Sequence, residues 1–254
     1  MCSFVIFNCG RFLCYYVVFE SEKKLGNQYR RRGIKVMDEK KDICISCRDV
    51  SLYDNRKNKL LDHINLEIER GKVYGIVGRN GSGKTMLFRA ICGLWKISEG
   101  KIEVDHQVIG KDIDFIKDAG ISIGETAFIG NLSGLDNLLL LADINKKIEK
   151  KDILQTLEIV LLDREKKKKY RKYSLGMKQK LRLAQAFMEH PSVLILDEPF
   201  NGLDSIAIKQ IREYLLEQKK SGVTVLIASH MAEDIEILCD KVYQMENGKI
   251  VGEE

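Results

Sequence analysis

One run of eight residues constrains the fold of this chain more than any other feature: Gly78-Arg79-Asn80-Gly81-Ser82-Gly83-Lys84-Thr85. It matches the pattern G-x-x-x-x-G-K-[ST], in which glycines let the backbone bend tightly. The apolar residues 73–77 before it read as a short strand, and residues 86–92 after it read as a helix. This order predicts a strand–loop–helix unit of an α/β protein whose loop binds phosphate.

The chemistry of this loop follows from its residue types. Inward-pointing backbone N–H groups and the positive end of the following helix favour an anion. Lys84 can reach the β- and γ-phosphates of a nucleotide, and the Thr85 hydroxyl can bind Mg²⁺. We therefore expect a nucleotide to contact the loop and the first helical turn, namely Gly78, Asn80, Gly81, Ser82, Gly83, Lys84, Thr85 and Met86.

A second motif ends in two acids. Residues 193–196 are Val-Leu-Ile-Leu, an apolar run typical of a buried strand, and Asp197 and Glu198 follow it directly. A parallel sheet binds ligands at the carboxyl ends of its strands, so these carboxylates are expected at a ligand site. We predict that Asp197 binds Mg²⁺, directly or through water, and that Glu198 orients and deprotonates an attacking water.

The body of the chain alternates strand and helix patterns, which predicts a parallel sheet covered on both faces. Residues 43–50, 64–69 and 101–109 read as half-buried strands, because apolar and polar residues alternate along them. A helical subdomain is expected at about 133–190, and its last helix, 175–190, should stop before Pro191. Residues 241–251 predict a hairpin that turns at Asn247-Gly248.

The positive net charge of +5 is unevenly distributed. Residues 1–36 hold seven of the 42 Lys and Arg residues but only two of the 37 Asp and Glu residues, which leaves 35 of each sign in the remainder. The balanced remainder argues against a nucleic-acid partner. The seven cysteines are odd in number and scattered, which is typical of reduced thiols rather than a disulfide framework.

The first 36 residues differ in character from the rest. Arg11 interrupts their apolar run, which makes a membrane-spanning helix a poor reading. Arg30-Arg31-Arg32-Gly33 can be encoded by a purine run just before Met37, as in a bacterial ribosome-binding site. We hypothesise that residues 1–36 are an over-extended reading frame or a disordered extension, and that one folded unit occupies 37–254. The alternative is a membrane-surface anchor, and N-terminal sequencing of the native protein would separate the two.

Several further motifs, taken with the phosphate loop and the acid pair, resemble one family. Residues 173–179, Tyr-Ser-Leu-Gly-Met-Lys-Gln, resemble the signature motif of ATP-binding-cassette (ABC) ATPases, usually Leu-Ser-Gly-Gly-Gln. Residues 200–204, Phe-Asn-Gly-Leu-Asp, resemble the family's D-loop, and Ser229-His230 resembles its switch histidine. Tyr53 fits the aromatic residue that stacks on adenine. The resemblance covers about residues 42–254.

The signature departs from the usual pattern, because Ser174 and Gly176 are kept whereas Leu175 and Met177 replace a glycine and the glutamine. This variant resembles the bacitracin- and lantibiotic-type exporters within the family. The glutamine of the family's Q-loop is also missing. Gly124 or Glu125 stands at its place, and Glu125 is the candidate because the subgroup often carries Glu there.

The resemblance implies a P-loop NTPase core with a mostly parallel sheet, a small antiparallel β subdomain and an inserted helical subdomain. It also implies an ATP hydrolase that uses ATP and Mg²⁺, with Lys84, Glu198 and His230 as catalytic residues. Ser174 and Gly176 would bind the γ-phosphate of an ATP held by a second cassette. The working unit would then be a homodimer or heterodimer with ATP sandwiched between two cassettes.

The resemblance further implies a role in an export-type membrane transporter. This chain would supply the energy, and a separate transmembrane permease would carry the substrate and hold the cassette at the cytoplasmic face of the cell membrane. A soluble ABC ATPase without transport is the alternative. Such proteins usually carry two cassettes or a specialised insertion, and neither is evident here. The transported substrate cannot be read from these residues.

Overall fold

The computed structural model describes residues 42–124 and 127–253. The hypotheses about residues 1–36 and the assignment of Glu125 concern positions outside these ranges. The described strands form two sheets. The first is antiparallel with the order β2-β1-β4-β5, and its strands are β1 (Ile43–Tyr53), β2 (Lys59–Glu69), β4 (Glu99–Val104) and β5 (Gln107–Val108). Alternating burial along β2 is typical of a sheet with one face toward the core.

The second sheet has six strands in the order β10-β9-β3-β8-β7-β6. All neighbours pair in parallel except β9 and β10, which form an antiparallel hairpin. Its strands are β3 (Val73–Val77), β6 (Ala119–Ser122), β7 (Val193–Asp197), β8 (Thr224–Ala228), β9 (Lys241–Glu246) and β10 (Lys249–Glu253). All five residues of β8 are buried, as expected for a central parallel strand covered on both faces.

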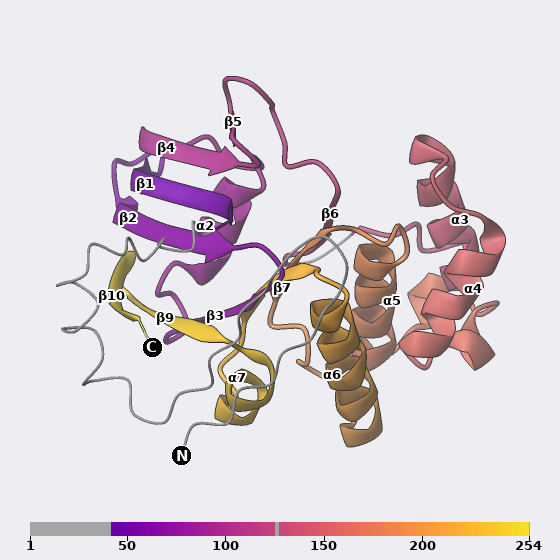
Figure 1. Ribbon diagram of the computed structural model, residues 1–254. Coiled ribbons are helices and arrows are strands. Elements are labelled where there is room, and N and C mark those ends of the chain that lie inside the picture. The colour runs from indigo at the N-terminus through magenta and orange to yellow at the C-terminus, as the bar shows by residue number, and fades with distance from the viewer. Residues whose placement is uncertain (1–41, 125–126, 254) are drawn as a thin grey trace, which may run out of the picture. The chain divides into compact units, whose positions relative to one another are not determined.

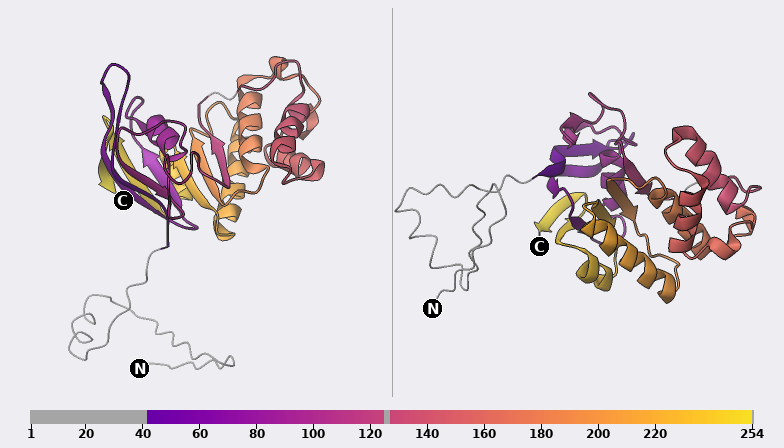
Figure 2. Two further views of the ribbon diagram at one scale, coloured as in Figure 1. Left: turned by 90° about the horizontal axis from the view of Figure 1, so that it is seen from above. Right: turned by 45° about the vertical axis from the view of Figure 1, so that its right-hand side comes forward.

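The helices are distributed unevenly around these sheets. They are α2 (Lys84–Ile91), α3 (Gly134–Asn145), α4 (Lys150–Ile159), α5 (Leu175–Phe187), α6 (Ser205–Lys220) and α7 (Ala232–Leu238), with short 3₁₀ turns η2 (Asp163–Glu165) and η3 (Tyr170–Lys172). Figures 1 and 2 show α3, α4 and α5 gathered on the side away from the antiparallel sheet. The predicted fold class, a mostly parallel sheet with an antiparallel sheet and added helices, is confirmed.

Two apolar clusters form the core. One joins the antiparallel sheet, α2 and the parallel sheet, and includes Ile64, Tyr74 and Phe88. The other joins the parallel sheet to the helices, and includes Leu138 and Phe187. Burial of such side chains stabilises the fold by about 1.5–3 kcal/mol each. The first cluster contains side chains of both β3 and α2, so the phosphate loop between them is fixed at both ends.

Several predicted element boundaries are corrected. The strands predicted at 43–50 and 64–69 are longer, because β1 extends to Tyr53 and β2 begins at Lys59, and the helix predicted at 86–92 spans Lys84–Ile91. The helix predicted at 175–190 ends at Phe187, because His190 has a left-handed backbone (φ +50°) and Pro191 follows. The strand predicted at 101–109 is a hairpin of β4 and β5. Asp105 and His106 turn the chain with φ of +48° and +64°, the conformation that suits a two-residue hairpin turn. The final hairpin extends to Glu253 rather than 251.

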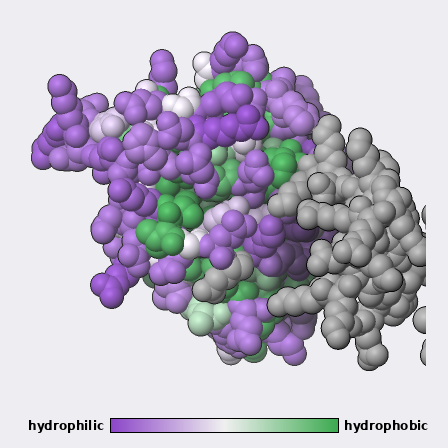
Figure 3. Space-filling view, turned by 60° about the vertical axis from the view of Figure 1, so that its left-hand side comes forward, coloured by the Kyte–Doolittle hydropathy of each residue, from purple (hydrophilic) through white to green (hydrophobic). Residues whose placement is uncertain are grey.

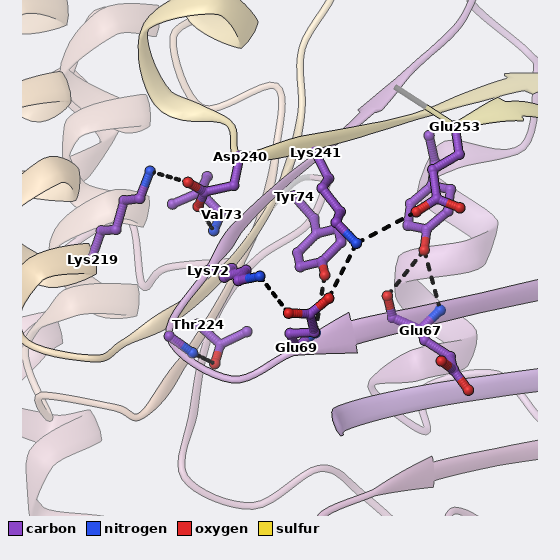
Figure 4. Close-up of polar contacts among 12 residues, drawn as sticks. Glu67, Glu69, Lys72, Val73, Tyr74, Lys219, Thr224, Asp240, Lys241 and Glu253 are labelled. Atoms are coloured by element: carbon purple, nitrogen blue, oxygen red, sulfur yellow. Dashed lines mark hydrogen bonds and ion pairs between the residues drawn. The ribbon is translucent and has the colours of Figure 1, made fainter. Parts of the chain in front are cut away.

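Ion pairs tie the two sheets together at the amino ends of the parallel strands (Figure 4). The carboxylate of Glu69 at the end of β2 pairs with Lys72 and with Lys241, the first residue of β9. These two lysines lower the pKa of Glu69 to about 2. Asp240 likewise accepts from the Val73 backbone N–H over 2.9 Å and pairs with Lys219.

In the coloured part of Figure 3, hydrophilic residues predominate, with hydrophobic residues exposed between them. In the described part of the chain, no helix combines the length and apolar character needed to cross a membrane.

Candidate nucleotide-binding site

The phosphate loop and the acid pair meet at the carboxyl edge of the parallel sheet. β3 ends at the loop and β7 ends at Asp197, with β8 between them. The Thr85 hydroxyl donates to Asp197 Oδ2 over 2.6 Å, although the two residues lie 112 positions apart. The sheet therefore joins the two motifs that the sequence predicted at one site.

Close packing explains two of the loop glycines. A Cβ atom at Gly78 would lie 2.2 Å from the Met245 carbonyl oxygen. At Gly83 it would lie 2.8 Å from Met245 Cε and 3.1 Å from the Leu60 carbonyl oxygen, in a backbone with φ +106°. A larger residue at either position would push the loop away from β9 and β2. The glycines thus let the loop sit directly on its supporting strands.

The loop presents polar groups suited to an anion. Lys84 is only 6% exposed, and its Nζ donates to the carbonyl oxygens of Gly78 at 2.7 Å and Arg79 at 3.3 Å. Among the described residues, both hydrogen bonds of this ammonium go to carbonyl oxygens and none goes to a carboxylate, and the buried Ser82 hydroxyl has no hydrogen-bond partner. A buried cation and an unused donor are costly unless a ligand engages them. Both fit a bound phosphate.

A cavity of about 460 Å³ opens over the loop. Its lining includes the predicted residues from Asn80 to Met86 together with Asp197 and Glu198. It also includes four residues that the sequence did not indicate: Lys59, Leu60, Asn247 and Gly248. Gly248 donates its N–H to the Ser82 carbonyl oxygen over 2.8 Å. The turn of the last hairpin therefore supports the loop, and no local pattern signals that contact.

Glu198 and His230 lie next to each other at the same edge. His230 Nδ1 is 2.7 Å from Glu198 Oε2. Glu198 follows β7, and His230 follows the neighbouring strand β8. Beneath them, the Ser229 hydroxyl donates to the fully buried Asp234 over 2.8 Å, and Arg212 Nε donates to Asp234 over 2.9 Å. This buried network holds the turn that carries His230, and Asp234 and Arg212 were not predicted.

Tyr53 does not line the cavity over the loop. It borders a neighbouring hollow with Trp95 and Lys96. Lys59 stands between the two spaces, because it lines the first cavity while its Nζ lies 5.6 Å from the centre of the Tyr53 ring. The predicted adenine-stacking residue is therefore adjacent to the described cavity rather than part of it.

Ser174 and Gly176 also lie outside the cavity lining. The Ser174 hydroxyl accepts from the Met177 backbone N–H over 3.3 Å and caps α5. A Cβ atom at Gly176 would lie 2.6 Å from the Gly202 carbonyl oxygen, so close packing against residues 200–204 requires glycine there. Lys180 pairs with Asp204, which caps α6, and these contacts join the two segments.

Comparison with known proteins identifies the family. The family model described as ABC transporter matches residues 61–201, from β2 through the acid pair. The chain belongs to the ABC transporter family. The match includes the phosphate loop, the segment 173–179 and the turn that carries Glu198.

Curated ABC relatives place the chain in the predicted subgroup. It is 40% identical over 195 residues to the uncharacterized ABC transporter ATP-binding protein YybJ of Bacillus subtilis (77% of this chain, 89% of the relative). It is 39% identical over 204 residues to the bacitracin transport ATP-binding protein BcrA of Bacillus licheniformis (80% and 66%). It is 34% identical over 195 residues to the lantibiotic transport ATP-binding protein SrtF of Streptococcus pyogenes (77% and 84%). The match thus spans about two thirds of the length of BcrA.

A solved structure supports the ABC fold. The dimeric cassette MJ0796 superposes with a TM-score of 0.75 at 23% identity, covering 83% of this chain and 97% of that one. The family match and the relatives confirm the predicted bacitracin- and lantibiotic-type ABC ATPase. The chain is an ATP-binding ATPase associated with a transporter, and the relatives do not support the soluble alternative.

The oxygen atoms at the ABC site also fit a divalent cation. The Thr85 hydroxyl and the Asp197 carboxylate approach within 2.6 Å, and hydroxyl and carboxylate oxygens are the ligands that Mg²⁺ prefers. Because Thr85 and Asp197 both line the cavity over the loop, a cation bound to them would lie next to the phosphates of a nucleotide in that cavity.

Proposed function

We propose that this chain is the ATP-hydrolysing subunit of an export-type transporter for bacitracin- or lantibiotic-like peptides. The substrate class rests on the names of the relatives BcrA and SrtF. The ATPase role rests mainly on the 2.6 Å contact between Thr85 and Asp197, which joins the phosphate loop to the acid pair in one cavity.

In this proposal the residues of the cavity divide the work of hydrolysis. The loop N–H groups and Lys84 bind and orient the phosphates of ATP. Glu198 accepts a proton from the attacking water, and His230, whose Nδ1 lies 2.7 Å from Glu198 Oε2, holds that carboxylate in place. Mg²⁺ held by Thr85 and Asp197 would neutralise charge on the phosphate oxygens.

Two cassettes complete one site. Ser174 and Gly176 lie outside the cavity of their own chain, which is consistent with a role at the ATP of a second cassette. Ser174 begins α5, so its hydroxyl and the free N–H groups of the first turn can bind a γ-phosphate. Closure of the dimer would exclude water from the two ATP molecules.

The transport partner is a separate permease. We propose that this subunit binds the permease at the cytoplasmic face of the cell membrane and transmits the closing motion to it.

Replacement of Glu198 by Gln tests the ATPase role. The amide keeps the shape of the side chain but cannot accept the proton, so hydrolysis should slow by about 10²–10⁴-fold. ATP binding should persist, because the phosphate loop is unchanged. The measurements are steady-state ATPase rate, nucleotide affinity, and size-exclusion chromatography with ATP. Unchanged turnover would contradict the role of Glu198, and a variant that stays monomeric with bound ATP would contradict the sandwich.

A further inference from the structure

Two side chains of α5 connect separate parts of the carboxyl edge. Gln179 is 1% exposed, and its Nε2 donates to the Pro199 carbonyl oxygen over 2.8 Å and, less favourably, to the Glu198 carbonyl oxygen over 3.4 Å. Arg182 donates to Gln179 Oε1 and to the Gly124 carbonyl oxygen. Gly124 follows β6, and Glu198 follows β7, its parallel neighbour.

The direction of these hydrogen bonds is fixed by chemistry. A guanidinium group only donates, so Arg182 requires the oxygen of the Gln179 amide to face it. The Gln179 nitrogen must then face the carbonyl oxygens of the turn. Gln179 and Arg182 are three positions apart and share one face of α5. The pair therefore acts as one unit with a defined orientation.

The turn that this pair holds has an unfavourable backbone conformation. Glu198 has φ of +49°, in the left-handed region that is unfavourable for a residue with a side chain. Its N–H donates to the Ala228 carbonyl oxygen over 2.9 Å, which fixes one side of the turn. Gln179 fixes the other side through Pro199, a buried residue whose carbonyl needs a donor.

We propose that Gln179 and Arg182 are positioning residues that connect the start of α5 to the turn carrying Glu198. A shift of α5, whose first residue follows Ser174, would move the amide of Gln179 and with it the carboxylate of Glu198. Binding of residues 173–179 to the ATP of a second cassette would in this way place the carboxylate of Glu198 in the position needed for hydrolysis. The inference rests on the proposed role of Glu198 as the general base.

The test uses Gln179→Glu, which keeps size and the acceptor for Arg182 but removes the donor to the turn. kcat for ATP hydrolysis should fall about tenfold, the equivalent of one hydrogen bond, with KM for ATP unchanged. The matched control is Gln210→Glu. Gln210 Nε2 donates to the carbonyl oxygens of Glu158 and Ile159 at the end of α4, away from the site, so this variant should keep the wild-type kcat.

A double variant separates positioning from general destabilisation. In a Glu198→Gln background the base is already absent, so adding Gln179→Glu should lower the residual rate by less than about twofold. If it lowers that rate tenfold again, or if Gln179→Glu alone is as active as wild type, the inference is wrong. Full activity of Glu198→Gln would instead overturn the proposed function.

A second variant keeps the inference testable if Gln179→Glu does not fold. If Gln179→Glu melts below the assay temperature, Arg182→Leu replaces it, since this change leaves the amide of Gln179 in place but removes the group that orients it. The same tenfold loss of kcat at constant KM is expected, and wild-type kcat would contradict the inference.

Discussion

The two edges of the parallel sheet carry similar residues but use them differently. At the amino edge, Glu69 pairs with Lys72 and Lys241, and Asp240 pairs with Lys219 (Figure 4). At the carboxyl edge, Lys84 donates to backbone carbonyls of its own loop. Charges at the first edge are neutralised when the chain folds.

The carboxyl edge has polar groups that are available to bind a ligand. Within the described residues, the ammonium of Lys84 bonds to carbonyl oxygens and to no carboxylate, and the hydroxyl of Ser82 has no hydrogen bond. Buried groups of this kind are stabilised when an anion supplies the missing interactions. The comparison teaches that the function of a charged residue here depends on whether its partner belongs to the chain or to the ligand.

Lys84→Ala should have the largest effect. Its loss removes the main cation from the loop, so ATP hydrolysis should fall by at least about 10³-fold, or ATP binding should be lost, with little change in melting temperature. Lys72→Ala at the opposite edge is the control, since it removes a lysine that pairs with Glu69. The ATPase rate of Lys72→Ala should match wild type. Equal losses of ATPase rate in the two variants would contradict the proposed difference between the two edges.

Thr85→Val should have an intermediate effect. The isosteric change removes the hydroxyl that donates to Asp197, so the rate should fall about 10–10²-fold and the Mg²⁺ concentration needed for half-maximal activity should rise. Thr224→Val is the counterpart at the amino edge, where the Thr224 hydroxyl accepts from the Gly71 backbone N–H over 3.0 Å. An unchanged Mg²⁺ requirement in Thr85→Val would argue against the cation site.

Glu69→Gln should have the smallest effect, and only on stability. Lys72 and Lys241 lose their ion pairs with Glu69, although Lys241 keeps Glu253, so the free energy of unfolding should fall by about 1 kcal/mol or less, while the ATPase rate stays constant. The pKa of Glu69 is lowered from 4.5 to about 2, so its contribution is present above about pH 4.5 and is lost as the pH falls toward 2. Urea unfolding at pH 7 and pH 3 should show the difference between wild type and variant shrinking; a constant difference would contradict this.

Local patterns were sufficient for much of the fold and of the candidate site. The loop at 78–85 lies between β3 and α2, and the apolar run at 193–196 is a buried strand that ends in Asp197, as predicted. The helix predicted from residue 175 begins there as α5, directly after its cap Ser174. Each of these features depends on hydrogen bonds or burial within a few residues, which is what a sequence pattern reports.

The sequence by itself thus determined the phosphate loop, the acid pair, the start of α5 and the family. Tertiary structure alone decided that Met245 and Gly248 support the loop, that Tyr53 borders a separate hollow, and that Gln179 holds the turn after Asp197. Those contacts join residues far apart in the chain, and they arise because the strand order brings β9, β3, β8 and β7 side by side. Periodicity along a sequence carries no record of which strands become neighbours, so packing has to supply it.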